Sequence, residues 1–217
     1  MIKLLRQNIL FFSLYGLLLL VVGVLQLMYT KDELMHWVNS HNSPEADFLF
    51  QHITYLGDGA FSVIMAIILA LASWRYGILG AASFALSGGI SSVLKHYVFT
   101  DSLRPLKYFE HSKWEYRVIE GLDIHSYNSF PSGHTITAFA IFSLMALLDG
   151  RKARSWFWLL LAALTGYSRV YLFQHFVEDA YAGSFIGVGS TLAVYYFFMQ
   201  YWEKNPRSWH QKGILRR

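Results

Sequence analysis

The sequence S-R-V-Y-L-F-Q-H-F-V-E-D, from Ser168 to Asp179, places four polar groups inside an otherwise apolar stretch. His175 and Asp179 are four residues apart, a spacing that brings both side chains to one face of a helix. A carboxylate bonded to one ring nitrogen of a histidine makes the other nitrogen a better base or nucleophile. Arg169 has the planar fork that suits a pair of phosphate oxygens. The simpler interpretation is an ion pair that closes a helix end.

The composition indicates a membrane protein of one domain, residues 1–217. Hydrophobic residues make up 54% of the 217, and charged residues only 15%, well below the usual quarter. The absence of cysteine excludes disulfides, a thiolate nucleophile and cysteine-bound metals. The net charge of +4 is a weak indication of nucleic-acid binding, and the distribution of the charges favours membrane topology instead.

Six apolar runs predict an all-α integral membrane bundle of six helices. The first, residues 9–28, could be a cleaved signal peptide, but it is too long and no small-residue cleavage site follows it. We therefore expect a retained helix, because about 20 apolar residues cross a bilayer. The other runs are Gly59–Trp74, Tyr76–Phe99, Pro131–Leu148, Ser155–Phe173 and Phe176–Trp202.

The charges predict the orientation of this bundle. Six spans place both termini on one side, which then carries eleven basic and two acidic residues, including those of the basic tail 203–217. The opposite side carries seven basic and twelve acidic residues. Basic residues near span ends stay in the cytoplasm, so we expect both termini to be cytoplasmic. The long polar loop 101–130 and the Ser168–Asp179 stretch then lie on the outer face.

Small residues predict where helices touch. The third run repeats small residues every four positions, and the sixth contains a G-x-x-x-G at Gly183 and Gly187. Such stripes allow close helix contact in lipid. The small residues repeated in the third run are Gly77, Ala81, Ala85 and Gly89.

Two further patterns point polar groups into the bundle. Asp179 continues the register of the two glycines of the sixth run, so the His175–Asp179 pair is expected to face the bundle interior. Ser87, Ser91 and Lys95 share a face of the third run, which points Lys95 inward. An ionisable residue that faces the interior of a membrane bundle indicates a functional site.

The segment P-S-G-H, residues 131–134, begins the fourth run. Ser132 can cap a helix N-terminus, whose free N–H groups and dipole favour an anion. Gly133 lets a ligand approach the backbone, and His134 stands in the first turn. A capped helix with an interfacial histidine is the alternative.

The three clusters together predict an anion site at the outer ends of the third to sixth runs. Lys95, Arg104 and Arg169 converge there on a helix N-terminus, with two histidines beside it. This set suits phosphoryl transfer, in which catalysis depends on positioning and charge stabilisation. One histidine can attack phosphorus and the other can protonate the leaving oxygen. A metal site is the rival, but neither H-E-x-x-H nor Asp-rich ligand spacing is present, so we expect no metal or cofactor.

These residues resemble the type-2 phosphatidic acid phosphatase superfamily, which shares its site with vanadium-dependent haloperoxidases. The motifs P-S-G-H, at 131–134, and S-R-x5-H-x3-D, at 168–179, are intact. The first motif, usually K-x6-R-P, has eight residues between Lys95 and Arg104-Pro105, and we expect a bulge within 99–102 to absorb the excess. The resemblance covers about residues 57–196.

The resemblance implies a metal-independent phosphatase. His175 would be the nucleophile that forms a phosphohistidine, and Asp179 would orient it. His134 would protonate the leaving group and then activate water. The phosphate oxygens would be held by Lys95, Arg104, Arg169, Ser132 and the Gly133 N–H.

The implied substrate is a membrane lipid phosphate, such as undecaprenyl diphosphate, phosphatidic acid, phosphatidylglycerol phosphate or a lipid A phosphate. The expected location is the bacterial inner membrane with a periplasmic active site, and no nucleic acid or obligate protein partner is expected. A lipid-to-lipid phosphotransferase with the same site and a catalytically inactive lipid-binding protein remain alternatives. A vanadate haloperoxidase is disfavoured because those relatives are soluble.

Overall fold

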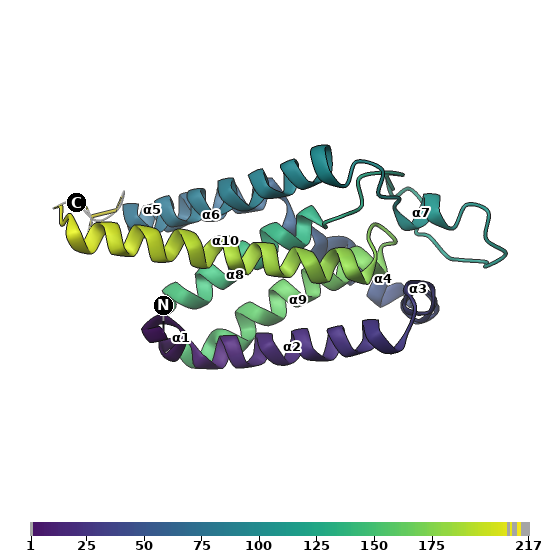
Figure 1. Ribbon diagram of the computed structural model, residues 1–217, viewed down its shortest axis with the longest axis horizontal. Coiled ribbons are helices and arrows are strands. Elements are labelled where there is room, and N and C mark those ends of the chain that lie inside the picture. The colour runs from purple at the N-terminus through teal and green to yellow at the C-terminus, as the bar shows by residue number, and fades with distance from the viewer. Residues whose placement is uncertain (1, 208, 210–211, 214–217) are drawn as a thin grey trace.

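The computed structural model describes residues 2–207, 209 and 212–213, and every regular element in that part of the chain is a helix, which confirms the all-α prediction (Figure 1). Part of the predicted basic tail 203–217 lies outside the described residues. The elements in chain order are α1 Ile2–Gln7, α2 Ile9–Met28, α3 Lys31–Ser40, α4 Pro44–Ile53, η1 Thr54–Gly57, α5 Gly59–Ala72, α6 Trp74–Val93, η2 Leu94–Val98, α7 Pro105–Tyr108, α8 Gly133–Leu148, η3 Lys152–Arg154, α9 Ser155–Tyr171 and α10 Val177–Lys204.

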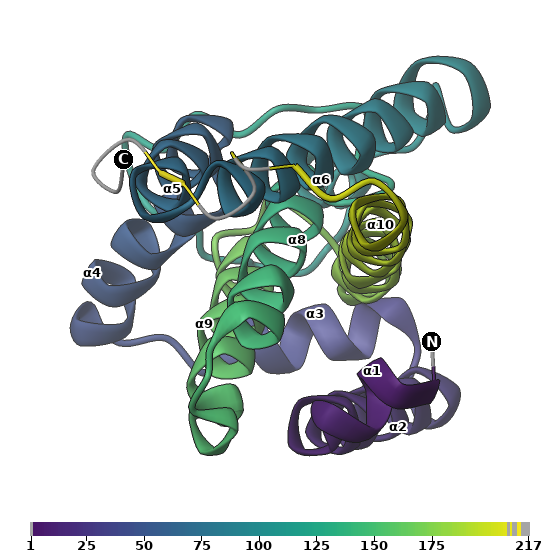
Figure 2. The same ribbon diagram turned by 90° about the vertical axis from the view of Figure 1, so that its left-hand side faces the viewer.

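Helix α8 forms the centre of the bundle, with α6, α9 and α10 packed around it (Figure 2). Eleven of its 16 residues are buried, and they include Phe139 and Phe142. A helix that is apolar on all sides is expected to be buried rather than to border water. This central position places the N-terminus of α8, with the P-S-G-H segment, inside the bundle.

The G-x-x-x-G of α10 contacts α8 directly, as predicted from its small residues. A Cβ atom built on Gly187 would lie 2.4 Å from the carbonyl oxygen of Ile136, and one on Gly183 would lie 3.0 Å from that of Ser132. The two glycines therefore allow the backbones to touch, and they bring the start of α10 beside the start of α8.

The small-residue stripe predicted for α6 is wrong. Gly77 does face Ala70 of α5, but Ala81, Ala85 and Gly89 are exposed. The buried face of α6 instead carries Gly80, Ser83, Ser87 and Ser91. These residues follow the helical period of 3.6 more closely than a strict four-residue repeat does. The prediction that Ser87 and Ser91 point inward with Lys95 is correct, since both serines are buried and Lys95 is half-buried.

Several helices have the length and apolar character of membrane spans. In the described part of the chain α2, the continuous segment Trp74–Val98 and α10 meet both requirements. A fourth crossing results if α4–η1 and α5, which are bent by 59° at Asp58, are counted as one broken span. The central α8 is shorter, at 16 residues. The six-span count therefore stays a prediction.

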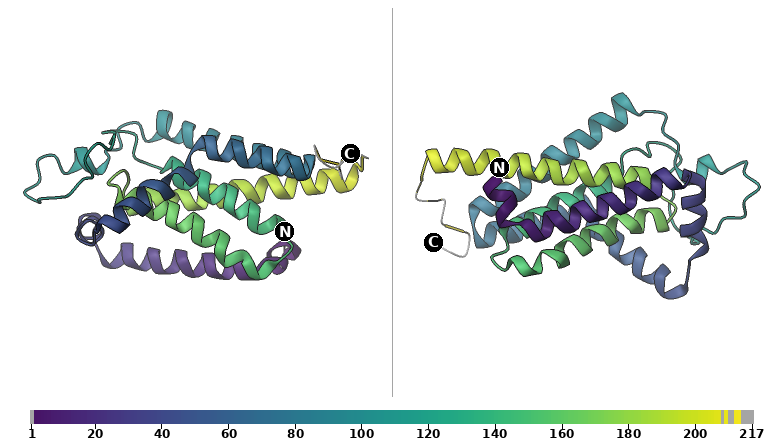
Figure 3. Two further views of the ribbon diagram at one scale, coloured as in Figure 1. Left: turned by 180° about the vertical axis from the view of Figure 1, so that it is seen from behind. Right: turned by 60° about the horizontal axis from the view of Figure 1, so that its bottom comes forward.

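The two ends of the bundle differ in character. Helix α1 and the last turns of α10 lie at one end, and α3, α4, α7 and the loop 101–130 lie at the other (Figures 1 and 3). Hydrogen bonds hold the two halves of the loop together, because the Arg104 N–H donates to the Ser126 carbonyl and the Ser129 N–H donates to the Ser102 carbonyl. The side chain of Asn39 in α3 fastens the loop to the bundle through two hydrogen bonds with the backbone of Arg117.

A second core lies beneath these outer segments. Met35 and Val38 of α3, Phe50 of α4 and Phe109 of the loop pack against the connection between α9 and α10. Phe173 and Phe176 of that connection are each 1% exposed. This cluster holds the connection in place, and the connection carries His175.

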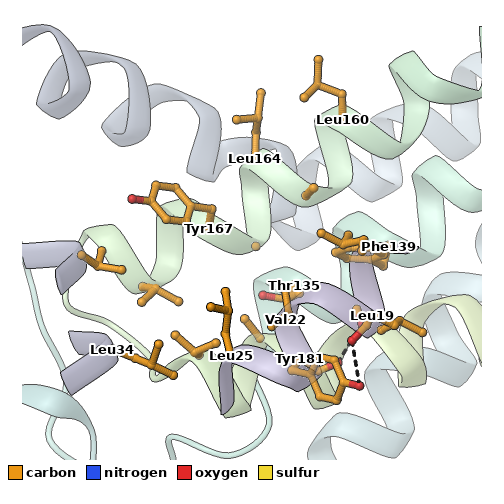
Figure 4. A pocket seen from close by; sticks show the side chains of 18 of the residues that line it. Leu19, Val22, Leu25, Leu34, Thr135, Phe139, Leu160, Leu164, Tyr167 and Tyr181 are labelled. Atoms are coloured by element: carbon orange, nitrogen blue, oxygen red, sulfur yellow. Dashed lines mark hydrogen bonds between the residues drawn. The ribbon is translucent and has the colours of Figure 1, made fainter. Parts of the chain in front are cut away.

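The first half of helix α2 packs into the main core through Phe11 and Tyr15, and its second half stands slightly apart from the bundle. An apolar cavity of about 310 Å³ separates it from α9 and α10, with Thr135 and Phe139 of α8 at its inner wall (Figure 4). The hydroxyl of Tyr181 bridges the gap by donating a 3.3 Å hydrogen bond to the Leu19 carbonyl. The walls of this cavity are therefore suited to hydrocarbon and not to a charged group.

Candidate active site

The connection between α9 and α10 reverses the chain so that His175 returns to Arg169. The N–H groups of Gln174 and His175 both donate to the Arg169 carbonyl, at 3.0 and 3.1 Å. Phe173 adopts φ = 60° at the turn, a left-handed conformation that is uncommon for a large side chain and costs about 1–3 kcal/mol. Packing of the Phe173 ring in the second core, against Phe109, holds this conformation.

His175 and Asp179 are paired, but not on one helical face as predicted. His175 precedes α10, whose first residue is Val177. Asp179 lies in the first turn, and its carboxylate accepts a 2.9 Å hydrogen bond from the Phe176 N–H. The same oxygen lies 3.3 Å from Nδ1 of His175 and accepts a hydrogen bond from the Ser129 hydroxyl. Both side chains of the pair are almost fully buried.

The surroundings keep the His175 ring neutral. Burial is the largest influence, and the charges of Arg104, Arg169 and Lys95 act in the same direction, so the pKa of His175 is held well below its ordinary value. A neutral ring with Nδ1 bonded to a carboxylate has its other nitrogen, Nε2, free for a substrate.

Three cationic side chains approach the ring from different elements. Lys95 donates to the Asn128 carbonyl at 3.1 Å, Arg104 to the Gln174 side chain at 3.0 Å, and Arg169 to the Thr54 hydroxyl at 2.7 Å. None of the three has an acidic partner within 4 Å in the described residues. Nε of Arg169 is also buried, and no described residue forms a hydrogen bond with it. Gathered cations without partners are costly unless an anion joins them.

Lys95 reaches the site through a local change of helix type. The end of α6 continues as the π-helix η2, and a turn at Thr100–Asp101 follows. A π-turn accommodates extra residues within a helix. The two additional residues between Lys95 and Arg104 are thus absorbed partly in η2, at 94–98, and not only in the expected bulge at 99–102.

The P-S-G-H segment enters the site at Gly133 and His134. Ser132 caps α8 as predicted, because its hydroxyl accepts from the Thr135 N–H at 3.4 Å and from the Thr135 hydroxyl at 2.8 Å. The Ser132 N–H donates to the Asp179 carbonyl at 3.1 Å, which ties α8 to α10. Ser132 itself is fully buried and does not line the cavity described next.

All the other predicted groups meet at one cavity of about 480 Å³, which His175 and His134 both line. Lys95, Arg104, Arg169 and Gly133 line it as well, while Asp179 stands behind His175. Asp58 and His134 form an ion pair on one wall, with Oδ1 and Nε2 2.6 Å apart. The arrangement can hold a phosphoryl group between two histidines.

Four polar residues around this cavity were not identified from the sequence. Thr54 and Gln174 orient the arginines, Ser129 contacts Asp179, and Asp58 contacts His134. Asp58 and His134 are 76 residues apart, and no spacing pattern links them. Ser129 lies two residues before P-S-G-H, and Gln174 occupies an unspecified position within S-R-x5-H-x3-D. Their position beside or inside a motif was the only sequence feature that could have identified them.

The chain is similar to several known proteins. The profile of the PAP2 superfamily matches residues 76–203. The undecaprenyl-diphosphatase BcrC of Bacillus subtilis (strain 168) is 29% identical over 149 residues, which cover 67% of this chain and 70% of the relative. The matches cover 33% and 47% of the lengths of two other curated relatives.

Two solved structures are similar. LpxE of Aquifex aeolicus has a TM-score of 0.65 and 26% identity, covering 76% of this chain and 93% of that structure. A PAP2 type phosphatidylglycerolphosphate phosphatase from Bacillus subtilis has a TM-score of 0.63 and 21% identity, covering 93% and 98%, and shows the shared fold. The matched region contains both intact motifs and both histidines of the cavity, and this chain belongs to the PAP2 superfamily of type-2 phosphatidic acid phosphatases.

Proposed function

We propose that the protein is a metal-independent membrane phosphatase that removes phosphate from lipid phosphates or diphosphates through a phosphohistidine. The observation that carries the proposal is the cavity itself. Two histidines line it together with three cations that have no acidic partner within 4 Å among the described residues. A tetrahedral phosphoryl group is the anion that such a set holds best, and a histidine ring is a suitable nucleophile toward it.

The proposed first step is an in-line attack of Nε2 of His175 on phosphorus. The N–P bond forms while the bond from phosphorus to the leaving oxygen breaks, and His134 donates a proton to that oxygen. Lys95, Arg104, Arg169 and the Gly133 N–H hold the other phosphate oxygens and stabilise the charge of the transition state. Water then attacks phosphorus, His134 accepts its proton, and the N–P bond breaks to release phosphate.

Asp179 acts behind the nucleophile in this scheme. Its bond to Nδ1 of His175 keeps the proton on that nitrogen in the neutral ring and stabilises the positive charge that develops as Nε2 bonds to phosphorus. Ser132 acts mainly by capping α8, so it orients the Gly133 N–H and does not itself bind the phosphate.

The substrate is proposed to be a membrane lipid. The charged cavity lies near the ends of apolar helices of the length that crosses a bilayer, where a lipid head group would be. The relative matched over 70% of its length is named an undecaprenyl-diphosphatase, so an isoprenoid diphosphate is the first substrate to test. The solved phosphatidylglycerolphosphate phosphatase names the next lipid class to test.

The proposed topology has six spans, with both termini in the cytoplasm and the cavity at the periplasmic face of a bacterial inner membrane. The excess of basic residues on the side of the termini supports it. The placement of α1 and the end of α10 opposite to the loop 101–130 also supports it (Figure 1). No nucleic acid and no obligate protein partner enter the proposal.

The test is phosphate release by the purified protein from a panel of lipid phosphates in detergent micelles, with a chelator present. We expect release from at least one lipid in the absence of divalent metal, and loss of that release in His175→Ala. Release that survives this substitution, or that requires a divalent metal, would overturn the scheme.

A further inference from the structure

Asp58 is an acidic residue of the cavity to which none of the three motifs assigns a role. It lies at the bend between η1 and α5, at the position that precedes the first residue of α5. Aspartate at this position ordinarily accepts a hydrogen bond from its own helix, which stabilises the helix by about 1 kcal/mol. The Asp58 side chain makes no such bond. Its Oδ1 lies instead 2.6 Å from Nε2 of His134.

Close backbone contact at Gly57 places Asp58 opposite His134. A Cβ atom on Gly57 would lie 2.6 Å from the carbonyl oxygen of His134 and 2.8 Å from its Cβ, so only glycine permits the approach. The Thr137 hydroxyl donates to the Gly57 carbonyl from the next turn of α8. Residue 58 is therefore held against the first turn of α8 by its neighbours, and its carboxylate meets the imidazole of His134 as a consequence.

The pairing leaves one ring nitrogen of His134 available. Nε2 is bonded to the carboxylate, whereas no described residue is hydrogen-bonded to Nδ1. The ring lines the cavity with His175, and Lys95, Arg104 and Arg169 line the other walls. These three cations disfavour a positive charge on His134, and a carboxylate in contact with the ring is the group that offsets them.

We infer that Asp58 is a positioning residue for His134, an inference that rests on the proposed phosphatase function. Asp58 keeps a proton on Nε2 and stabilises the imidazolium form, which donates the Nδ1 proton to the leaving oxygen. When water attacks the phosphohistidine, Nδ1 of the neutral ring accepts the proton from water. Asp58 exchanges no proton in either step, and it acts only through His134.

Asp58→Asn preserves the size of the side chain and removes its charge, so it tests this role. The substrates are two phosphate monoesters: a dialkylglycerol phosphate, whose alkoxide is a poor leaving group, and 4-nitrophenyl phosphate, whose leaving group needs little protonation. We expect kcat for the lipid to fall about tenfold to a hundredfold, the range of a weakened general acid, with KM within about twofold. The expected loss for 4-nitrophenyl phosphate is less than about threefold. The ratio of the two losses does not depend on the fraction of protein that is folded.

Two comparisons complete the test. In a His134→Ala background, Asp58→Asn is expected to cause no further loss, because a residue that acts through His134 has no effect without it. Asp123→Asn removes an equal charge from another wall of the same cavity and is expected to leave the ratio of the two substrates unchanged. Equal losses for both substrates, an additional loss in the His134→Ala background, or the same change of ratio in Asp123→Asn would each overturn the inference. Absence of phosphate release by the wild-type protein from every lipid phosphate and diphosphate of the panel would instead contradict the proposed function.

Discussion

Nδ1 of His175 lies 3.3 Å from Oδ2 of Asp179, although His175 precedes the helix that carries the aspartate. The pair forms because Asp179 reaches back toward the start of α10, where it also accepts the Phe176 N–H at 2.9 Å. A helix-capping interaction and the orientation of the proposed nucleophile therefore use the same carboxylate. Changes to that carboxylate should affect both the chemistry and the local structure.

Asp179→Asn should reduce kcat by a factor on the order of 10²–10⁴, because an amide can hold the wrong tautomer of His175 and cannot stabilise its positive charge. Ser129→Ala removes only one hydrogen bond to the carboxylate and should cost about tenfold or less. Initial rates of phosphate release at saturating lipid measure both. A loss in Ser129→Ala equal to that in Asp179→Asn would contradict this account of the carboxylate.

Replacing Arg104 by glutamine should move the acid limb of the pH–rate profile to higher pH. Burial and the charges of Arg104 and Arg169 hold the pKa of His175 well below its ordinary value, so the ring stays neutral, and able to attack phosphorus, when the pH falls below 6.5. Arg104→Gln removes a positive charge and should raise the pKa of His175. The acid limb of kcat/KM should then move to higher pH, in addition to any loss of rate. A limb that stays in place, or moves to lower pH, would contradict the electrostatic argument.

Gly187→Ala should destabilise the bundle by about 1–3 kcal/mol, because the added Cβ would overlap the backbone of α8. Gly189→Ala is the matched control on the same helix, since nothing lies within 4 Å of its added Cβ. That variant should be neutral or up to about 1 kcal/mol more stable, because alanine favours helix. The Tm of each protein in detergent measures the difference. Equal Tm values for the two variants would show that the close contact of α8 and α10 is not formed.

Asp149→Asn should lower stability by about 1 kcal/mol with little change in kcat. Asp149 accepts hydrogen bonds from Arg154 and Trp158 at the turn between α8 and α9, remote from the cavity. The Arg154 guanidinium is the main cause of a pKa of Asp149 that is below its ordinary value. The folded-state pKa is depressed, so the full stabilisation is present above about pH 4, the ordinary pKa of the carboxyl, and it is lost progressively as the pH falls from there to the lower folded-state pKa. A Tm difference from wild type that is as large at pH 3 as at pH 7 would contradict this assignment.

The sequence predicted the parts of the fold that depend on composition and periodicity. The six apolar runs lie within a few residues of α2, α5, α6, α8, α9 and α10, since long apolar helices are the strongest pattern in a chain. The stripe Gly77–Gly89 was a wrong prediction because a four-residue repeat drifts around a helix of 3.6 residues per turn. The π-helix at Lys95 had no recognisable signal beyond the two extra residues in the spacing.

For the candidate site, the sequence predicted the contacts within each motif and missed the contacts between distant segments. Spacing within a motif identified His175 with Asp179 and placed Gly133 beside His134, because those residues are close in the chain. Contacts across the bundle, such as Asp58 with His134 and Thr54 with Arg169, depend on how helices pack. A single sequence carries no pattern for contacts of that kind. The burial of Ser132 behind its own cap likewise became apparent only in three dimensions.

The most direct test of the central claim is identification of the phosphorylated residue. The enzyme would be mixed with a lipid phosphate substrate at saturating concentration, quenched in base within milliseconds to seconds, and digested for mass spectrometry under conditions that preserve phosphohistidine. We predict a phosphoryl group on Nε2 of His175, present during turnover and absent in His175→Ala. Phosphorylation of a different residue, or a burst of product from an enzyme that carries no phosphoryl group, would contradict it.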